Sequence, residues 1–348
     1  MQAETSYMRE AIELALKAWG MTSPNPLVGA VIVKDGKVTG RGFHEQAGKA
    51  HAEINALAES GRTAQKADLY VTLEPCSTFG RTPPCADAII RAGIGRVFIG
   101  SLDPNPAHAG RGVDILKNAG IEVFTGMEKD SCDAINEAFF KWITAGAPFV
   151  ILKMAMTLDG KIATRDGQSK WITGPAARQR VQRLRQWSDA ILVGGNTARN
   201  DRPSLTVRDI PGWRQPRRLV ASKTLTPEAL KSLLPEGATP ELIRADGAAG
   251  WQAEMRRLGS EKVTALLIEG GGELASAVLN AGIVDKVEFH IAPKILGGRD
   301  SRPVIGGGNP LTLAESLALK NIAIERAGED IIVAGCPDYS AGKSGSLR

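Results

Sequence analysis

The sequence predicts an α/β protein built from two consecutive domains. The chain has 348 residues, which exceeds the about 250–300 residues at which a single core usually stops growing. Short apolar runs alternate with helical segments, a pattern typical of mostly parallel sheets covered on both faces. The segment TAGAP at 144–148 interrupts this pattern. We therefore expect one domain over 1–146, a second over 147–337 and a flexible polar tail over 338–348.

The first half opens with an amphipathic helix near 6–20, followed by the apolar strand 27–34. Asp35-Gly36 then predicts a hairpin turn into a second strand, KVTGRGF. The remaining elements alternate: helices near 51–60, 84–92, 111–119 and 131–144, and strands at 68–75, 96–100 and 121–126.

The second half repeats this alternation with different elements. It opens with the strand FVILKMAM, and a long basic helix follows at about 175–187. Further segments are strands at 190–195 and 217–222, a strand and helix within 263–282, and late strands at 286–295 and 330–335. A second α/β domain follows from this order.

Composition limits the possible functions. The chain is 43% hydrophobic and 23% charged, and no apolar run reaches the about 18–20 residues of a membrane span. The N-terminus does not resemble a signal peptide, so we expect a cytoplasmic protein. The net charge of +5 comes from scattered side chains, which favours small acidic ligands such as phosphates over nucleic acid. Four cysteines are too few for a disulfide framework and favour thiolate chemistry.

A possible zinc site lies in the first half. His51 and Glu53 begin one predicted helix, and Cys76 and Cys85 surround the start of the next. A His, Cys, Cys ligand set leaves the fourth tetrahedral position of zinc open for water, and zinc lowers the pKa of that water to about 7. Zinc nucleobase deaminases carry His-x-Glu followed by Pro-Cys-x-x-Cys, with the Glu as acid and base. The pattern predicts the same roles here, although Cys85 lies nine positions after Cys76.

Less specific interpretations exist for these residues. Free cysteines are often buried core residues, and we interpret Cys132 and Cys336 in that way. A structural zinc site would need a fourth ligand. His44 is a possible one, but its spacing in the sequence does not support this role. The joint pattern of His-x-Glu and two Pro-Cys pairs favours the catalytic interpretation.

Four segments of the first half together resemble one known family. They are PNPLVGAVIVKDG, HAEINAL, LEPCSTFGRTPPCADAI and DPNP with GRG shortly after it. They are similar to the deaminase domain of the bifunctional riboflavin-biosynthesis deaminase/reductase family, which implies a cytidine-deaminase-like α/β/α fold. The resemblance also implies that Asn25 lines the substrate pocket. Thr78 and Ala30 depart from the His and Cys that this family often carries.

The second half resembles the reductase domain of the same family. Its glycine segment, LLIEGGGELASAVL, suits a phosphate at a helix N-terminus, although close strand–helix packing explains it equally well. TLDGKIAT, GQSKWITG, ILVGGNTARNDRPSLTVR and APKILGG are the resembling segments. The resemblance covers roughly 5–336 and implies a dihydrofolate-reductase-like α/β fold that uses NADPH.

The resemblance also implies specific binding residues in this half. Expected on the cofactor side are Ala155, Trp171, Thr197, Asp201, Ser222, Gly271, Gly272, Glu273, Leu274, Ala275, Ser276 and Ala277. Expected on the substrate side are Lys153, Ser169, Arg185, Leu205, Arg208 and Glu269. Arginine suits a phosphate because its guanidinium binds in a bidentate manner. Ala221 departs from the Asp that relatives often carry before Ser222, and Lys223 is a candidate partner for the extra phosphate of NADPH.

The resemblance implies two consecutive reactions with Zn²⁺ and NADPH as cofactors. Zinc hydroxide attacks C2 of 2,5-diamino-6-(ribosylamino)pyrimidinone 5′-phosphate and ammonia leaves; hydride transfer to the ribosyl chain then gives the ribityl compound. The partner is thus a phosphorylated pyrimidine rather than nucleic acid or membrane, and we expect a homodimer or homotetramer. The alternatives are a tRNA base deaminase with an accessory domain, a non-catalytic zinc-stabilised binding protein, and a chain with one degenerate half.

Overall fold

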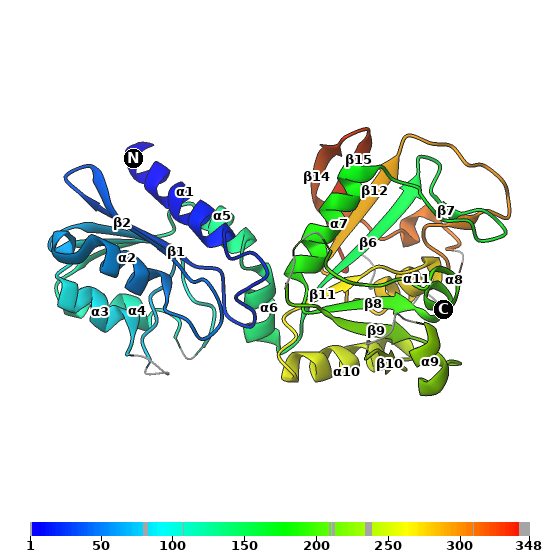
Figure 1. Ribbon diagram of the computed structural model, residues 1–348, viewed down its shortest axis with the longest axis horizontal. Coiled ribbons are helices and arrows are strands. Elements are labelled where there is room, and N and C mark those ends of the chain that lie inside the picture. Colours follow the sequence, from blue (N-terminus) through cyan, green and yellow to red (C-terminus); the bar gives the residue numbers. More distant parts are fainter. Residues whose placement is uncertain are drawn as a thin grey trace. The chain divides into compact units, whose positions relative to one another are not determined.

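The computed structural model describes residues 2–78, 83–106, 108–208, 210, 213–233, 239–308 and 310–340. The chain forms two compact units, Met1–Gly146 and Ala147–Arg348 (Figure 1). Residues 79–82 of the segment between Cys76 and Cys85, and residues 341–348 of the expected tail, lie outside the described part. Within that tail, Tyr339 Oη donates a hydrogen bond to the Val284 carbonyl oxygen at 3.2 Å.

The first unit is built on a five-stranded sheet with the order β2-β1-β3-β4-β5. Its strands are β1 (Gly29–Lys34), β2 (Lys37–Phe43), β3 (Asp68–Leu73), β4 (Arg96–Ser101) and β5 (Glu122–Thr125). Its helices are α1 (Gln2–Leu16), α2 (Ala52–Ser60), the 3₁₀ turn η1 (Gly61–Ala64), α3 (Cys85–Ala92), α4 (Arg111–Asn118), α5 (Lys129–Ala134) and α6 (Glu137–Ala145).

This sheet is mixed, whereas the strand–helix alternation predicts a mostly parallel one. The expected hairpin at Asp35-Gly36 makes β2 antiparallel to β1. Strand β1 lies between β2 and β3 and is antiparallel to both, and only β3, β4 and β5 run parallel. The difference arises because β3 pairs with β1 and not with β2. Such pairing depends on contacts between distant segments, and the local periodicity of the sequence does not predict it.

Helices cover both faces of the first sheet, so this unit has three layers, α/β/α. Residues of α1 and α5, among them Met8 and Cys132, pack with Val31 of β1 on one face. Helices α2, α3 and α4 pack with Ala30 and Ile32 on the other. Alternate residues of β1 therefore serve opposite cores, as the two-residue period of a strand requires.

A single long helix is expected at 131–144, but the structure contains two, α5 and α6. Asn136, which is buried, lies between them. Its side chain accepts a hydrogen bond from the Leu27 N–H at 2.8 Å and donates one to the Leu27 carbonyl at 2.9 Å. These bonds hold the segment before β1, which carries Asn25, against the C-terminal helices of the unit.

The second unit is built on an eight-stranded sheet with the order β10-β9-β8-β11-β6-β12-β15-β14. Its strands are β6 (Phe149–Thr157), β8 (Ala190–Gly194), β9 (Arg217–Ala221), β10 (Glu241–Ile243), β11 (Ala265–Ile268), β12 (Lys286–Ala292), β14 (Leu319–Ala327) and β15 (Asp330–Pro337). A separate two-stranded sheet joins β7 (Lys161–Ala163) and β13 (Arg302–Pro303). Its helices are α7 (Pro175–Trp187), α8 (Gly195–Asp201), α9 (Pro227–Leu233), α10 (Gly247–Ser260), α11 (Gly272–Asn280) and the 3₁₀ turn η2 (Leu313–Glu315).

The two faces of the large sheet differ in character. On one face, residues of α10 and α11 pack with Val150, Leu152 and Met154 of β6 in a hydrophobic core. Helix α7 covers the other face, where Trp187 contacts Phe149 edge-on at 6.1 Å between ring centroids. Because side chains of a strand alternate between faces, the second face carries Lys153 and Ala155.

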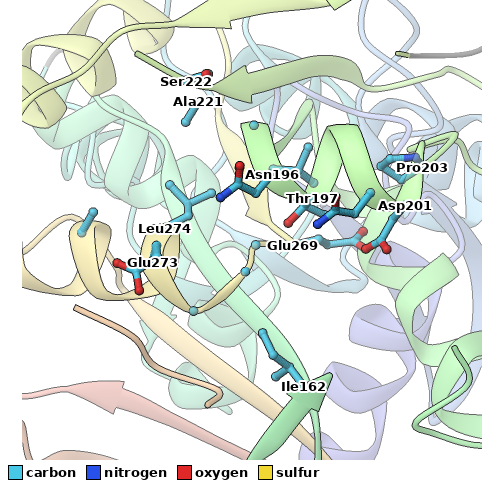
Figure 2. Close-up of a pocket in the computed structure, with 18 of the residues that line it drawn as sticks. Ile162, Asn196, Thr197, Asp201, Pro203, Ala221, Ser222, Glu269, Glu273 and Leu274 are labelled. Atoms are coloured by element: carbon cyan, nitrogen blue, oxygen red, sulfur yellow. The ribbon is translucent and has the colours of Figure 1, made fainter. Parts of the chain in front are cut away.

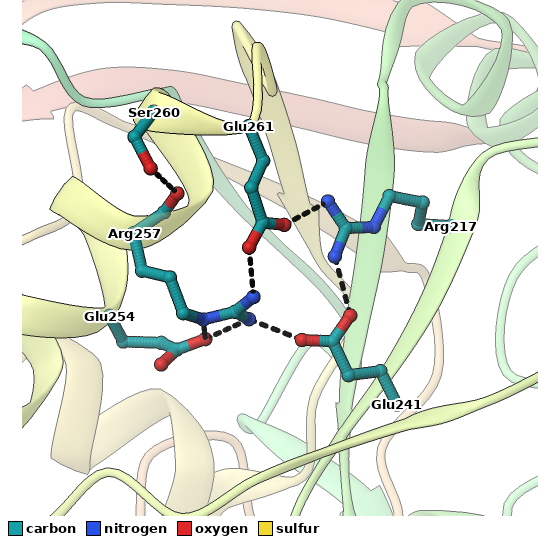
Figure 3. A network of polar contacts seen from close by, with 6 residues as sticks. All are labelled: Arg217, Glu241, Glu254, Arg257, Ser260 and Glu261. Atoms are coloured by element: carbon teal, nitrogen blue, oxygen red, sulfur yellow. Dashed lines mark hydrogen bonds and ion pairs between the residues drawn. The ribbon is translucent and has the colours of Figure 1, made fainter.

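An ion-pair network ties the β10 edge of this sheet to α10 (Figure 3). Arg217 of β9 contacts Glu241 of β10 at 2.5 Å and Glu261 at 2.7 Å. Arg257 of α10 bridges Glu241, Glu254 and Glu261. Each side chain is partly exposed, so a single pair contributes at most about 1 kcal/mol. Together the pairs hold strand β9, which forms part of the cavity described below.

At the other edge, strand β14 was missed by the apolar periodicity. Both of its faces are largely exposed, including Ile322 and Ile324 at 50% and 69%.

None of the helices in the described part of the chain has the length and apolarity needed to cross a membrane.

Candidate functional sites

Three predicted metal ligands of the first unit converge. His51 is the N-cap of α2, Cys76 follows β3, and Cys85 is the first residue of α3. His51 Nδ1 lies 3.2 Å from Cys85 Sγ and 3.6 Å from Cys76 Sγ. All three ligand atoms lie within 4.8 Å of one another.

This geometry fits a tetrahedral zinc ion. Zn–S and Zn–N bonds of about 2.3 and 2.0 Å at tetrahedral angles place N and S about 3.5 Å apart, close to the two observed separations. The Cys85 N–H also donates a hydrogen bond to Cys76 Sγ at 3.2 Å. A hydrogen bond from the Cys85 thiol, partly opposed by burial, lowers the pKa of Cys76 to about 4, so a thiolate is available to bind a cation.

Glu53 lies in the first turn of α2, beside this cluster. It is only 3% exposed. Burial, together with the negative charge of Cys76, raises the pKa of Glu53 to about 7. A carboxyl group with a pKa near neutrality can both accept and donate a proton, which is what an acid–base catalyst requires.

Asn25 lies next to the cluster, held by a histidine whose role the sequence did not reveal. His44 Nδ1 contacts the Ala50 carbonyl oxygen at 3.0 Å, and its Nε2 contacts Asn25 Nδ2 at 3.1 Å. The carbonyl can only accept, so Nδ1 carries the proton and Nε2 accepts from the Asn25 amide. The Asn25 carbonyl oxygen is thus directed away from His44. His44 also packs edge-on against His51, with ring centroids 5.4 Å apart.

Glu74, directly after β3, organises the segment that joins β4 to α4, and sequence reasoning missed it. This buried carboxylate accepts backbone hydrogen bonds from Asp103 at 3.2 Å, Gly110 at 3.0 Å and Gly112 at 2.9 Å. A Cβ on Gly112 would lie 2.2 Å from the Pro75 carbonyl oxygen, so only glycine allows this approach. The available signal was an acidic residue directly before Pro75-Cys76, at the end of a buried strand.

The second unit contains a cavity of about 1330 Å³. Figure 2 shows Ala221 and Ser222 of the β9 end at one side of it, Ile162 of β7 at the other, and Thr197, Asp201 and Glu269 between them. Among the predicted residues, the cavity is lined by Lys153, Ala155, Ser169, Trp171, Arg185, Thr197, Asp201, Leu205, Arg208, Ser222, Glu269, Gly271, Gly272, Glu273, Leu274 and Ala277.

Two predicted cofactor residues do not line the cavity. Ala275 is fully buried in the hydrophobic core beneath α11. Ser276 is buried as well, and its Oγ accepts a long hydrogen bond from Asn280 at 3.4 Å. Ala275 lies on the sheet-facing side of α11, whereas Ser276 faces Gly307, where a Cβ would lie 2.1 Å from its Oγ. A helix directs only part of each turn toward any one surface.

Arg185 is held by a carboxylate rather than free in the cavity. Its Nε and Nη2 donate to the two carboxylate oxygens of Glu269 at 2.6 and 2.8 Å, and its Nη1 donates to the Thr206 carbonyl at 3.1 Å. Its guanidinium is thus already bidentate with a carboxylate, whereas the sequence interpretation assigns it to a phosphate. Burial acts to raise the pKa of Glu269, but Arg185 and Lys153 hold it below its usual value.

Other predicted residues also have defined surroundings. Trp171 is 63% exposed, and the Arg178 guanidinium lies 4.7 Å from its ring centroid. Ser169 Oγ donates to Asp201 at 3.1 Å. Leu205 has a φ of 50°, a left-handed conformation that is rare for leucine and often marks a functional loop.

The part of the cavity lined by Ser222, Lys223 and Asp246 combines two charged side chains with a close backbone approach. Ser222 Oγ accepts a hydrogen bond from the Leu225 N–H at 3.1 Å, and a Cβ on Gly195 would lie 2.8 Å from this oxygen. Lys223 Nζ contacts Asp246 at 2.6 Å, and both side chains are exposed.

Two family models match the two units. The model described as the cytidine and deoxycytidylate deaminase zinc-binding region covers residues 1–101, and the model described as the RibD C-terminal domain covers 148–333.

Full-length relatives share both units. The riboflavin biosynthesis proteins RibD of Actinobacillus pleuropneumoniae and Aquifex aeolicus are each 42% identical, over 95% of this chain and 94% and 98% of theirs. The Escherichia coli RibD is 39% identical over 93% of this chain and 97% of its own.

Solved structures give the same result. Acinetobacter baumannii RibD is 37% identical with a TM-score of 0.86, covering 97% of this chain and 99% of that one. The Thermotoga maritima diaminohydroxyphosphoribosylaminopyrimidine deaminase/5-amino-6-(5-phosphoribosylamino)uracil reductase is 34% identical with a TM-score of 0.86 and the same coverage. The expected pair of folds is thereby confirmed, and these matches favour the riboflavin-biosynthesis interpretation over a tRNA deaminase. The protein belongs to the RibD family and is a bifunctional enzyme of riboflavin biosynthesis, a zinc-dependent deaminase followed along the chain by an NADPH-dependent reductase.

Proposed function

We propose that the first unit deaminates 2,5-diamino-6-(ribosylamino)pyrimidinone 5′-phosphate at C2, and that the second unit reduces the ribosyl chain of the product. The observation that supports the first step is the buried Glu53 beside a three-ligand His, Cys, Cys cluster. The observation that supports the second is a separate, large cavity whose wall carries Lys153, Arg185 and Glu269.

In the first site His51, Cys76 and Cys85 would hold zinc, which when bound makes a water molecule acidic enough to attack at neutral pH. Glu53 takes a proton from this water and gives it to the amino group on C2. The C2–N bond breaks, ammonia leaves, and the water oxygen remains as the carbonyl of the uracil. The Asn25 carbonyl oxygen, oriented by His44, is placed to accept a hydrogen bond from the pyrimidine.

In the second site NADPH would supply hydride to C1 of the ribosyl chain. The bond between C1 and the ring oxygen breaks as that oxygen takes up a proton. Lys153 is the proposed proton-carrying group nearest this step, because it lines the cavity beside Glu269. Arg208 is the proposed phosphate ligand, since Arg185 is occupied by Glu269.

The proposed cofactor residues surround the same cavity. The first turn of α11, from Gly271, offers backbone N–H groups that have no partner within the helix for the pyrophosphate. The exposed ring of Trp171 offers a face for packing, and Thr197 and Ser222 also line the cavity. We propose a cytoplasmic location, because reduced Cys ligands suit that compartment. We also propose a homodimer or homotetramer, supported by the exposed edge strand β14 and testable by sedimentation.

Mass spectrometry of the product tests the two reactions together. Incubation of the zinc-loaded protein with the diaminopyrimidine ribosyl phosphate alone should add about one mass unit, and NADPH should add about two more. A mass gain of two without the first gain would contradict the order of the steps. No mass change from a protein that retains zinc would contradict the proposed substrate.

A further inference from the structure

A row of charged residues crosses neighbouring strands at the wall of the cavity in the second unit. In the parallel pairing of β6 with β12, Lys153 lies directly opposite Glu288. In the pairing of β6 with β11, Leu152 lies opposite Ile268, so Glu269, the next residue, flanks Lys153 on its other side. Neighbouring strands lie about 4.8 Å apart, and paired residues share one face. Lys153 is therefore the centre of a Glu288–Lys153–Glu269 row.

Helix α7 covers this row and supplies an arginine to each carboxylate, but the two pairs differ in strength. Arg185 binds Glu269 at 2.6 and 2.8 Å, whereas Arg180 approaches Glu288 only at 3.3 and 3.4 Å. Coulombic attraction falls with distance and with solvent exposure, and the Arg180 side chain is 37% exposed. The negative charge of Glu288 is therefore less offset by its arginine than the charge of Glu269 is.

His290 orients Glu288 from the same strand. It is 0% exposed, and its Nε2 donates to Glu288 Oε1 at 2.8 Å. Its Nδ1 has no hydrogen-bond partner among the residues that the structure describes. Burial lowers the pKa of His290, so the ring is neutral, with its proton on Nε2 directed at Glu288. A fully buried His–Glu pair without access to the cavity has no role in holding a ligand itself.

Lys153 needs such support to carry a proton. Burial lowers its pKa, and the charge of Arg185 lowers it further, while Glu269 and Glu288 act to raise it. We propose that Glu288, oriented by His290 and Arg180, is a positioning residue whose negative charge, one strand away, stabilises the Lys153 ammonium group at the cavity wall for the reduction. This inference rests on the proposed function, in which the ring oxygen receives a proton as C1 receives hydride.

The first test measures Lys153 itself. The zinc-loaded full chain is labelled with a trace of acetic anhydride over a range of pH, and acetylation of Lys153 is quantified by peptide mass spectrometry. In Glu288→Gln, the pH midpoint of Lys153 labelling should move to lower pH, because one of the two carboxylates that stabilise the ammonium is gone. The groups that surround Lys153, and that remain in this variant, are Glu269, Arg185, His290 and Arg180.

The second test measures reduction of the deaminated substrate by NADPH. Glu288→Gln should lower kcat about tenfold or more, because less of Lys153 would be in the protonated form that acts as the acid, with a smaller change in KM for NADPH. His290→Gln retains an N–H donor for Glu288 and should keep most of the activity, whereas His290→Leu should resemble Glu288→Gln. The alkaline limb of the kcat profile should follow the labelling midpoint, because Lys153 must be protonated to give its proton.

Asp285→Asn is the matched control. Asp285 directly precedes β12 and accepts a hydrogen bond from the Val150 N–H at 2.7 Å, so this variant also loses a carboxylate between β6 and β12, but away from Lys153. It should lower the melting temperature without moving the labelling midpoint. If Glu288→Gln likewise lowers only the melting temperature, or if His290→Leu and His290→Gln behave alike, the inference is wrong. Labelling requires no turnover, so an absence of reductase activity in the parent protein would count against the proposed function alone.

Discussion

The Arg185–Glu269 pair allows a prediction whose size follows from its surroundings. The Arg185 and Glu269 side chains are 9% and 15% exposed and joined by two short hydrogen bonds. Arg185→Met keeps the approximate volume but leaves a buried carboxylate without its main partner. Breaking a buried pair in this way costs about 3–5 kcal/mol of unfolding free energy. For a domain of this size the melting temperature should fall by about 6–20 °C.

The destabilisation should depend on pH in a defined direction. In the parent protein, Arg185 holds the pKa of Glu269 below its usual value against the opposing effect of burial. The pair therefore stabilises the fold above the unfolded-state pKa and loses this effect as pH falls through the folded-state pKa. In Arg185→Met burial dominates and favours the protonated carboxyl, so the loss of stability should be largest at alkaline pH and smallest in acid.

Melting temperatures from pH 5 to 9, for Arg185→Met, Glu269→Gln and the double variant, test this reasoning. The double variant has a neutral pair of similar shape and should be more stable than Arg185→Met, because no buried charge remains uncompensated. The reasoning is refuted by a destabilisation independent of pH, or by a double variant as unstable as Arg185→Met. A large rise in KM for the phosphorylated substrate with no loss of stability would instead restore Arg185 as the phosphate ligand.

Three further predictions concern the other sites. Glu53→Gln should lower the rate of deamination by about 10²–10⁴-fold, the usual contribution of acid–base catalysis. Zinc should stay bound, and reduction of the deaminated substrate should be unchanged. Retained ammonia release would exclude Glu53 as the base. Glu74→Ala should lower the unfolding free energy by about 1–3 kcal/mol, because the buried N–H groups of Asp103, Gly110 and Gly112 lose their acceptor; chemical denaturation measures this, and an unchanged midpoint would contradict it. Lys223→Ala should reduce the preference for NADPH over NADH in direct binding titrations. The reason is that Lys223 is a cation that lines the cavity and is paired with the exposed Asp246. Equal losses of affinity for both cofactors would argue against a contact with the extra phosphate.

The alternation of apolar runs and helical segments was sufficient to predict two α/β domains. The metal cluster was also predictable, because His51 caps the start of a helix and Cys76 lies just after a strand. Local signals of this kind place a side chain at the end of an element, and the ends of neighbouring parallel strands meet at one edge. The strand order was harder to infer, and the insertion of β1 between β2 and β3 made the first sheet mixed.

Partners far apart in the sequence could not be read from it. The sequence interpretation assigns Arg185 to a phosphate, but its position opposite Glu269 depends on how α7 lies across the sheet. Asn136 looked like an interior helical residue, yet its side chain binds the backbone of Leu27, more than a hundred positions earlier.

The sequence alone thus determined the chemistry that the chain carries: a His, Cys, Cys ligand set with its Glu53, and a glycine-rich turn at a helix N-terminus. The tertiary structure decided which charges face one another, including Glu288, Lys153 and Glu269 from three different strands. The physical reason is that ligand spacing is a local property of the backbone. Strand order and register, in contrast, depend on burying the whole set of apolar faces at once.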